Sequence, residues 1–378
     1  MPQPLDRIVR RTVLPVACAV LAGLAPTRIA YAQTPAPAPA APRATDLRWR
    51  VRTAEHVDLW LHGLALVLDD TARIPLFRRG YRAAIRAERA RVSAYTQLDA
   101  EQERLRARVA ANPPLGLAAQ FVPLAFGSFE EIQRAVTAFV QAGGDPGRAG
   151  DEGTANAIAF LAQSFPAPAD RDWLRIYTNA LQDERDRFYH RYWLSLQQAR
   201  SAPLAATDSV WQRVVRPRLQ RYLSGSQQSD GTLLVSPVLG GEGRTQNGSN
   251  RENVVAVAYP ARAGDAAEAS YTAVHEFVGS VVGPVVADNT SPADQRSGLA
   301  ARYVSAGQVR GGLLLLRRSA PDLADGYARF YLREAGLPVP NGSGPGGGAQ
   351  AALEAAFPLP AAVLDAVSRQ LDVVLRGI

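Results

Sequence analysis

Two short β-rich runs interrupt a sequence that otherwise has the spacing of helices. They are residues 232–236 (TLLVS) and 253–259 (NVVAVAY), and residues 240–250 between them are rich in glycine, asparagine and serine. This pattern is typical of two strands joined by a hairpin loop, so a hairpin is predicted here. Residues 266–282 then read as a helix, which Gly283-Pro284 should end. A small sheet within a mostly helical chain predicts a helix-dominant α+β fold.

Apolar residues at helical spacing fill most of the rest of the chain. Ser128-Phe129-Glu130-Glu131 is a capping-box signal at the start of one such run. The predicted helices are residues 46–70, 74–111, 128–142, 156–164, 170–200, 209–223, 294–319, 322–334 and 351–375. We therefore expect a helical domain over residues 46–225 and an α+β domain over residues 226–378.

Residues 1–32 are predicted to be a signal peptide, because several arginines precede an apolar stretch over residues 12–25. Ala30-Tyr31-Ala32 fits the small-x-small rule for cleavage, and the apolar stretch is too short to span a bilayer. Arg10-Arg11 leaves a twin-arginine signal open, and Cys18 leaves a lipoprotein signal open. We expect a secreted or periplasmic protein with no membrane span after cleavage.

Cleavage after Ala32 would leave a protein without cysteine, since Cys18 is the only one in the chain. That excludes disulfides, a thiolate nucleophile and cysteine-ligated metals. Residues 33–45 follow as a linker rich in proline and alanine. The formal net charge is +7, and the basic residues, all of them arginine, are interspersed with acidic ones. Since no basic face is interleaved with aromatic residues, nucleic-acid binding is not expected.

The helix predicted over residues 266–282 divides into two faces at about 100° per residue. Alanine, valine and phenylalanine side chains fill one broad arc. The other arc carries His275, Glu276, Gly279 and Ser280, and so offers one imidazole and one carboxylate. Zinc-peptidase helices show the same division, with two histidines on the polar face and a glutamate that activates water.

The run His275-Glu276-Phe277-Val278-Gly279 resembles the active helix of zincin metallopeptidases of the Glu-ligand type. It is most similar to a bacterial secreted family of largely uncharacterised proteins, whose helix reads H-E-F-x-H and closes with a proline, as Pro284 does here. Residues 303–310 (YVSAGQVR) resemble the family's later Tyr-Val-x-Glu-x-x-x-Arg pattern. The resemblance covers roughly residues 230–335 and implies that the domain over residues 226–378 is zincin-like.

The resemblance also implies roles for four positions. His275 is the remnant of the first zinc ligand and Glu276 of the general base, whereas Gly279 replaces the second histidine and Ala306 the Glu ligand. A catalytic zinc needs three protein ligands and an open position for water. With two ligands absent, we expect no cofactor, no tightly bound zinc and no peptidase activity. Gly279 is consistent both with close packing of another element and with a retained cleft.

Three functional hypotheses follow. The first is a pseudo-peptidase that binds a peptide or protein in the former cleft, or has a structural role in the envelope. The second is an active metal-dependent hydrolase that uses His275 and Glu276 with unconventional ligands such as Asp288. The third is a non-enzymatic helical envelope protein in which the His-Glu pair is coincidental. The remaining candidates are expected to be packing, surface, loop or capping residues: His56, His62, His190, Asp288 and Asp294.

Overall fold

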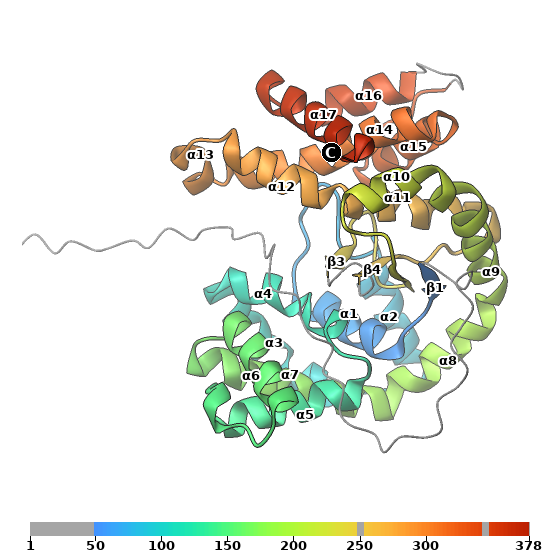
Figure 1. Cartoon of the computed structure of the whole chain (residues 1–378). Helices are drawn as coiled ribbons and strands as arrows, with labels where there is room; N and C mark the ends of the chain where they lie inside the picture. Colours follow the sequence, from blue (N-terminus) through green and yellow to red (C-terminus); the bar gives the residue numbers. More distant parts are fainter. Residues whose placement is uncertain (1–48, 248–252, 342–347, 378) are drawn as a thin grey trace, which may run out of the picture.

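The computed structural model describes residues 49–247, 253–341 and 348–377 (Figure 1). Helices make up 70% of the structure and the strands form one four-stranded sheet, which confirms the predicted helix-dominant α+β class. The predicted signal peptide and the linker lie outside the described residues. No described helix combines the length and the apolar character that crossing a bilayer requires.

The sheet has the strand order β1-β2-β4-β3. β1 (Arg50–Arg52), β2 (Gly231–Ser236) and β4 (Asn253–Ala258) are parallel, whereas β3 (Arg244–Gln246) is antiparallel to β4 at one edge. The predicted hairpin is therefore wrong, because the two β-rich runs lie side by side in parallel. The intervening strand β3 is short and polar, so it lacks the apolar alternation that marks a strand. β1 lies within a segment predicted to be helical, which corrects that helix as well.

Both faces of the sheet are buried, as is usual for parallel strands. Leu233 and Val235 of β2 belong to one hydrophobic core, together with Val255 and Val257 of β4. Leu234 lies between them in sequence and belongs to a different core on the opposite face. Successive side chains of a strand point to opposite faces, so each strand contributes to both cores. The sheet therefore separates two layers of helices.

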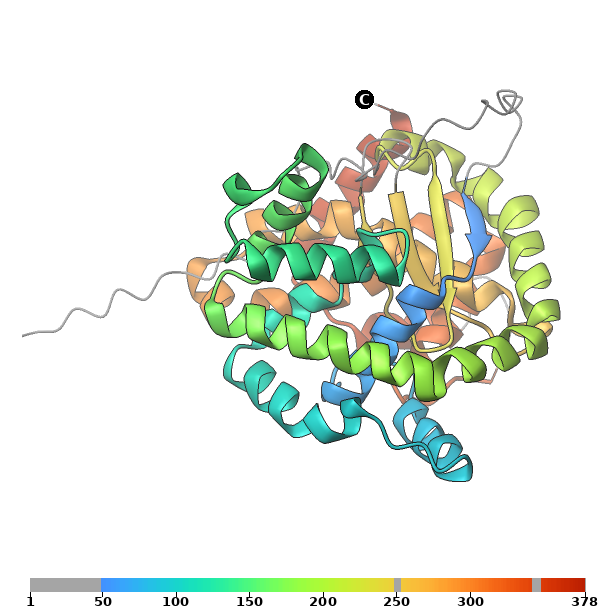
Figure 2. The ribbon, with the colours of Figure 1, turned by 90° about the horizontal axis from the view of Figure 1, so that it is seen from below.

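The first layer is built on α1 (Glu55–Val67), which follows β1 directly. Residues 57–67 are all buried, as expected for a helix that is covered on every side. Figures 1 and 2 show the other helices of this layer around α1 on one side of the sheet. They are α2 (Tyr81–Arg91), α3 (Gln97–Ala111), α4 (Pro113–Ala119), α5 (Phe129–Gln141), α6 (Glu152–Ser164) and α7 (Pro168–Glu184).

Two long helical segments, each with a π-helical turn, connect the layers. α7 continues through a π turn (Arg185–Tyr189) into α8 (His190–Ala199). The second segment joins α9 (Ser201–Val210) to α10 (Arg216–Gly225) through a π turn at residues 211–215. In Figure 1, α8, α9 and α10 run along one side of the molecule from the first layer to the second. Their side chains reach both cores: Tyr189 packs in the first, and Trp211 and Leu219 pack in the second.

The second layer covers the opposite face of the sheet. It contains the helix that carries His275 and the helices that follow it in the chain (Figure 1). They are α11 (Ala267–Phe277), α12 (Gly279–Asp288), α13 (Pro292–Arg296), α14 (Leu299–Ser319), α15 (Ala324–Glu334), α16 (Gly348–Ala356) and α17 (Ala361–Arg376).

The helix predicted over residues 266–282 is broken at Val278, and α12 continues through Pro284. The predicted stop at Gly283-Pro284 is therefore wrong. The break at Val278 is explained by a side chain from another element. The hydroxyl of Tyr222 in α10 donates a 2.9 Å hydrogen bond to the carbonyl of Phe277. The Val281 amide donates to Val278 instead of Phe277. A carbonyl taken by a distant side chain ends the helix earlier than the local sequence indicates.

Candidate functional site

His275 and Glu276 lie in the last turn of α11 and are both buried, with 1% and 8% of their surface exposed. Their side chains contact each other, with His275 Nδ1 3.1 Å from Glu276 Oε1. In a zinc-peptidase helix these two groups face a shared open cleft. Here the imidazole and the carboxylate instead form a closed pair inside the protein.

The Glu276 carboxylate is held against the edge of the sheet. Its Oε1 accepts a 3.0 Å hydrogen bond from the Gly243 amide, and its Oε2 accepts a 3.1 Å bond from the Thr245 hydroxyl in β3. Burial opposes ionisation, but the hydrogen bond from His275 and the positive charges of His275 and Arg244 outweigh it, so the pKa of Glu276 is lowered. Glu276 is therefore an ionised structural acceptor that links α11 to β3.

Gly243 is required for this contact. A Cβ atom at this position would lie 2.8 Å from Glu276 Cγ and 2.3 Å from the carbonyl oxygen of Ala256. Both distances are well below van der Waals contact, and the second involves backbone in the neighbouring strand. Only glycine lets the chain before β3 approach the carboxylate this closely.

The His275 ring is covered by Tyr331 of α15. The two rings are stacked, with their centroids 5.4 Å apart and an angle of 23° between their planes. Tyr331 is itself fixed by a 3.1 Å hydrogen bond from its hydroxyl to the Gly241 carbonyl. The Nδ1 atom of His275 faces Glu276, and its Nε2 is buried with no hydrogen-bond partner among the described residues.

Gly279 and Ala306 are not brought together by a direct contact. Gly279 begins α12, on the other side of the break at Val278. The space where its side chain would lie is approached by Gln308 of α14, whose Nε2 would be 3.0 Å from a Cβ atom, and by no other residue of the described chain outside α12 within 4 Å. Ala306 is partly buried and lies two positions before Gln308, which is about 200° around the helix.

The other candidates lie elsewhere. Asp288 is exposed at the far end of α12, about 14 Å along the helix axis from Gly279. Asp294 accepts hydrogen bonds from Ser291 at the start of α13. His56 contacts the Phe126 carbonyl, and His190 contacts Glu55. Among the residues that the structure describes, no group of three or more His, Cys, Asp and Glu side chains is placed to hold a metal ion.

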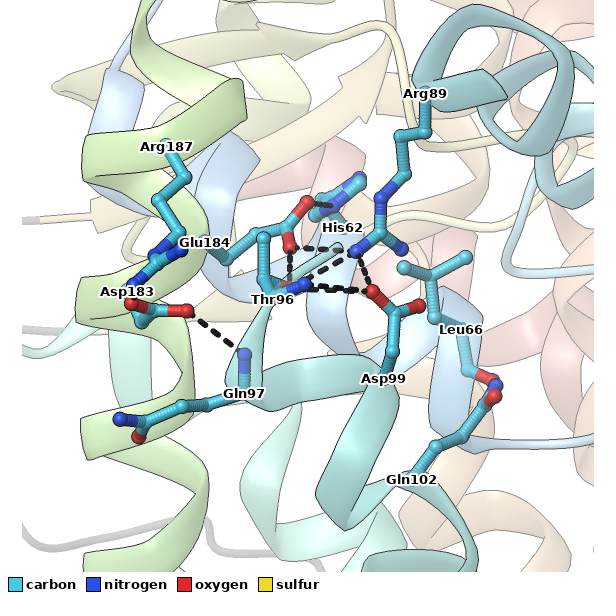
Figure 3. Close-up of polar contacts among 10 residues, drawn as sticks. All are labelled: His62, Leu66, Arg89, Thr96, Gln97, Asp99, Gln102, Asp183, Glu184 and Arg187. Carbon is cyan, nitrogen blue, oxygen red and sulfur yellow. Dashed lines mark hydrogen bonds and ion pairs between the residues drawn. The ribbon is translucent and has the colours of Figure 1, made fainter. Parts of the chain in front are cut away.

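The first layer contains a buried polar network that the sequence does not predict (Figure 3). Glu184, at the end of α7, accepts 3.0 Å hydrogen bonds from His62 Nε2 and from Arg89 Nη2, and another from the Thr96 hydroxyl. Arg89 also pairs with Asp99 in α3. Burial opposes ionisation of Glu184, but His62, Arg89 and Thr96 together lower its pKa. This network joins α1, α2, α3 and α7.

Comparisons with known proteins give no further assignment. No family model, no curated protein and no solved structure matches this chain.

Proposed function

We propose that this chain is a non-catalytic, exported protein with a zincin-like second layer, in which the former catalytic pair has a structural role. The observation that carries the proposal is that both oxygens of the Glu276 carboxylate are hydrogen-bonded inside the protein. A general base must leave one oxygen within reach of the water that it activates. Both oxygens of Glu276 already accept hydrogen bonds, from His275, the Gly243 amide and the Thr245 hydroxyl.

The geometry of His275 supports the same proposal. Its Nδ1 is directed to Glu276, and its ring is covered by Tyr331. A metal at Nε2 would need further ligands, and the residues aligned with the missing ligands are Gly279 and Ala306. A single imidazole does not hold zinc tightly. The pair therefore serves to fix α11 to the sheet rather than to bind a metal.

We further propose that the protein acts by binding a peptide or another protein beside this pair, as an envelope component. The strand β3 supports this, because it is the edge of the sheet and pairs with β4 on one side only among the described strands. Extended peptides bind to such edges by adding a strand. The neighbouring Glu276 fixes β3 through Thr245, so the edge is rigid where a peptide would lie.

The test is metal analysis of the purified mature protein together with a peptidase assay. We expect no stoichiometric zinc and no cleavage, and the same result for His275→Ala. Stoichiometric zinc that His275→Ala abolishes would overturn the proposal. It would favour the second candidate, an active metal-dependent hydrolase, for which the unpartnered Nε2 of His275 is the supporting observation.

Restoring the ligands tests the family relationship separately. If the second layer derives from zinc-binding ancestors, Gly279→His combined with Ala306→Glu should create zinc affinity that neither change gives alone. Gln308→Glu in place of Ala306→Glu is the matched control, because Gln308 is the residue that contacts Gly279. Zinc binding by the control alone would move the ligand position to residue 308, and binding by neither pair contradicts the relationship.

A further inference from the structure

α8 (His190–Ala199) contacts α1 but contains no buried residue. Tyr192 and Trp193 pack against the first core only as partly buried side chains, and Leu194 is exposed. In contrast, α7 and α10, which belong to the same connecting segments, both carry buried apolar residues. A helix with few buried apolar contacts opens at a lower free energy than the core of a protein. α8 therefore depends on its polar contacts to stay in place.

The side-chain contacts between α8 and α1 involve ionisable groups. The Trp193 indole donates a 2.8 Å hydrogen bond to Asp58 Oδ2, and His190 Nδ1 lies 2.9 Å from Glu55 Oε1. The His190–Glu55 contact is an ion pair only when the imidazole is protonated, and Glu55 also pairs with Arg185 in the π turn before α8. The attachment of α8 to α1 is therefore expected to respond to pH.

Asp58 is buried inside the protein although its side chain can ionise. Only 1% of its surface is exposed, and it forms no ion pair with an arginine or histidine among the described residues. A buried carboxyl group without a paired cation is most stable in its neutral form. Burial accordingly raises the pKa of Asp58 to about 7, against the hydrogen bonds from Ser236 and Trp193 and the charge of Arg200.

The side chains around Asp58 come from several elements, and α8 supplies an essential part of them. The charged or titratable groups that interact with it belong to α1, α2, the π turn, α8, its C-cap and the residue after β4: Glu55, Tyr81, Tyr189, Tyr192, Arg200 and Tyr259. Burial raises the pKa of all four tyrosines, so they stay neutral when Asp58 ionises. Because Tyr192, Trp193 and Arg200 belong to α8 or its C-cap, displacement of α8 would admit water to Asp58.

We propose that α8 is a pH-dependent cover of α1, which protonation of Asp58 and His190 holds in place and ionisation of Asp58 releases. In water the Asp58 carboxyl group has its ordinary pKa of 3.8, so the open form binds this proton less tightly than the closed form. The closed form is therefore fully favoured below that value and loses its advantage as the pH rises to about 7. Between these limits the equilibrium constant for opening grows about tenfold per pH unit.

Opening of α8 would change a cleft on the surface of the first layer. The cleft has a volume of about 700 Å³, and its lining includes Val92 and Tyr95 after α2 together with Tyr192 and Ser195 of α8. Because α8 forms one side of the cleft, the cleft would widen when Asp58 ionises. This device does not depend on the roles of His275 and Glu276.

The test is hydrogen–deuterium exchange of the full mature protein at pH 5 and pH 7.5, with each rate divided by the intrinsic rate at that pH. We expect the protection of residues 190–199 to fall about tenfold or more between these two values in the wild type. In Asp58→Asn it should change much less, because the amide cannot titrate but can still accept from Trp193. The matched control is Asp186→Asn, since Asp186 is exposed, lies in the preceding π turn and lines the same cleft. This control should keep the wild-type response.

An equal fall in Asp58→Asn and the wild type would overturn the proposal. An equal fall throughout α14 would do so as well, because it would mean that the whole protein opens rather than α8. Trp193→Phe covers the case in which Asp58→Asn does not fold, because it removes the indole donor and keeps an aromatic ring. α8 should then lose protection at both pH values, and unchanged protection in this variant contradicts a role for the Trp193–Asp58 contact. Circular dichroism establishes that each variant is folded.

Discussion

Two buried carboxyl groups on opposite sides of the sheet, Glu276 and Asp58, have opposite protonation behaviour. Glu276 is surrounded by donors from His275, the Gly243 amide and Thr245, and its pKa is lowered despite burial. Asp58 is equally buried and accepts a 2.8 Å bond from the Trp193 indole, but burial dominates and raises its pKa to about 7. The hydrogen bond and charge of His275, with the charge of Arg244, outweigh burial at Glu276, whereas the bonds from Ser236 and Trp193 do not outweigh it at Asp58.

This difference separates a carboxylate that stays ionised from one whose charge changes near neutral pH. The ionised Glu276 holds α11 to β3, as Glu184 holds the helices of the first layer together. Asp58 faces Glu55 on its own helix, Ser236 on β2, Trp193 on α8, Arg200, and the tyrosines Tyr81 and Tyr189. Its charge therefore changes near neutral pH, at the carboxyl end of β2.

The largest effect is expected in the first layer, at Glu184. Glu184→Ala removes the acceptor shared by His62, Arg89 and Thr96 and leaves Asp99 as the one carboxylate paired with Arg89 among the described residues. Breaking a buried ion pair on one side costs about 3–5 kcal/mol. Urea denaturation measures the loss, and Glu101→Ala is the control, because its pair with Arg104 at 3.7 Å is on the surface. Similar losses in both variants would show that the network contributes no more than a surface pair.

Asp58 is expected to make stability depend on pH. Its folded pKa of about 7 lies above the unfolded value of 3.8, so the folded state keeps a proton that the unfolded chain has lost. Its contribution is therefore present at low pH and lost as the pH rises to about 7, by at most about 4 kcal/mol. Asn at position 58 cannot titrate, so the free energy of unfolding of Asp58→Asn should gain on the wild type between pH 4 and 7.5.

Parallel pH curves for Asp58→Asn and the wild type would contradict the raised pKa. Asp288→Asn is the control, since Asp288 is exposed at the end of α12. Subtracting the wild-type curve from that of Asp58→Asn removes the contributions of all other titrating groups, because both proteins contain those groups.

Much of the fold can be predicted from the sequence, because helices are marked by local spacing. The start of α5 at Phe129, with Ser128 accepting from the Glu131 amide, is one example. The errors arise where distant residues decide the structure. Tyr222 breaks the helix after Phe277. β2 pairs with β1, although all the helices of the first layer lie between these two strands in the sequence. Likewise, His62 and Glu184 are 122 positions apart, so no local pattern reveals their contact.

Glu276→Gln should have a smaller effect, and an opposite pH dependence. The amide can still accept from the Gly243 N–H, but it loses the charge that His275 and Arg244 stabilise. We expect a loss of about 1–3 kcal/mol at neutral pH. The lowered pKa of Glu276 stabilises the fold above pH 4.5, and this contribution disappears as the pH falls through the folded value.

As the pH rises from 3 to 7, Glu276→Gln should therefore lose stability relative to the wild type, whereas Asp58→Asn should gain stability relative to the wild type. Thermal unfolding at pH 3 and pH 7 is sufficient to separate the two. A Glu276→Gln protein that is as stable as the wild type at pH 7 would contradict a structural role for the carboxylate.

The smallest effect is expected for Gly279→Ala. A Cβ atom there would lie 3.0 Å from the Nε2 atom of Gln308, which is the end of a flexible side chain and can move. Alanine favours a helix by up to about 1 kcal/mol over glycine, so we expect unchanged or slightly higher stability. Gly243→Ala is the matched comparison and should be clearly destabilising, because its Cβ atom would meet the Ala256 carbonyl at 2.3 Å. A loss of more than about 1 kcal/mol in Gly279→Ala would instead mean that α14 packs too closely for any side chain, as in overpacked cores. That result would also exclude a retained cleft beside Gly279.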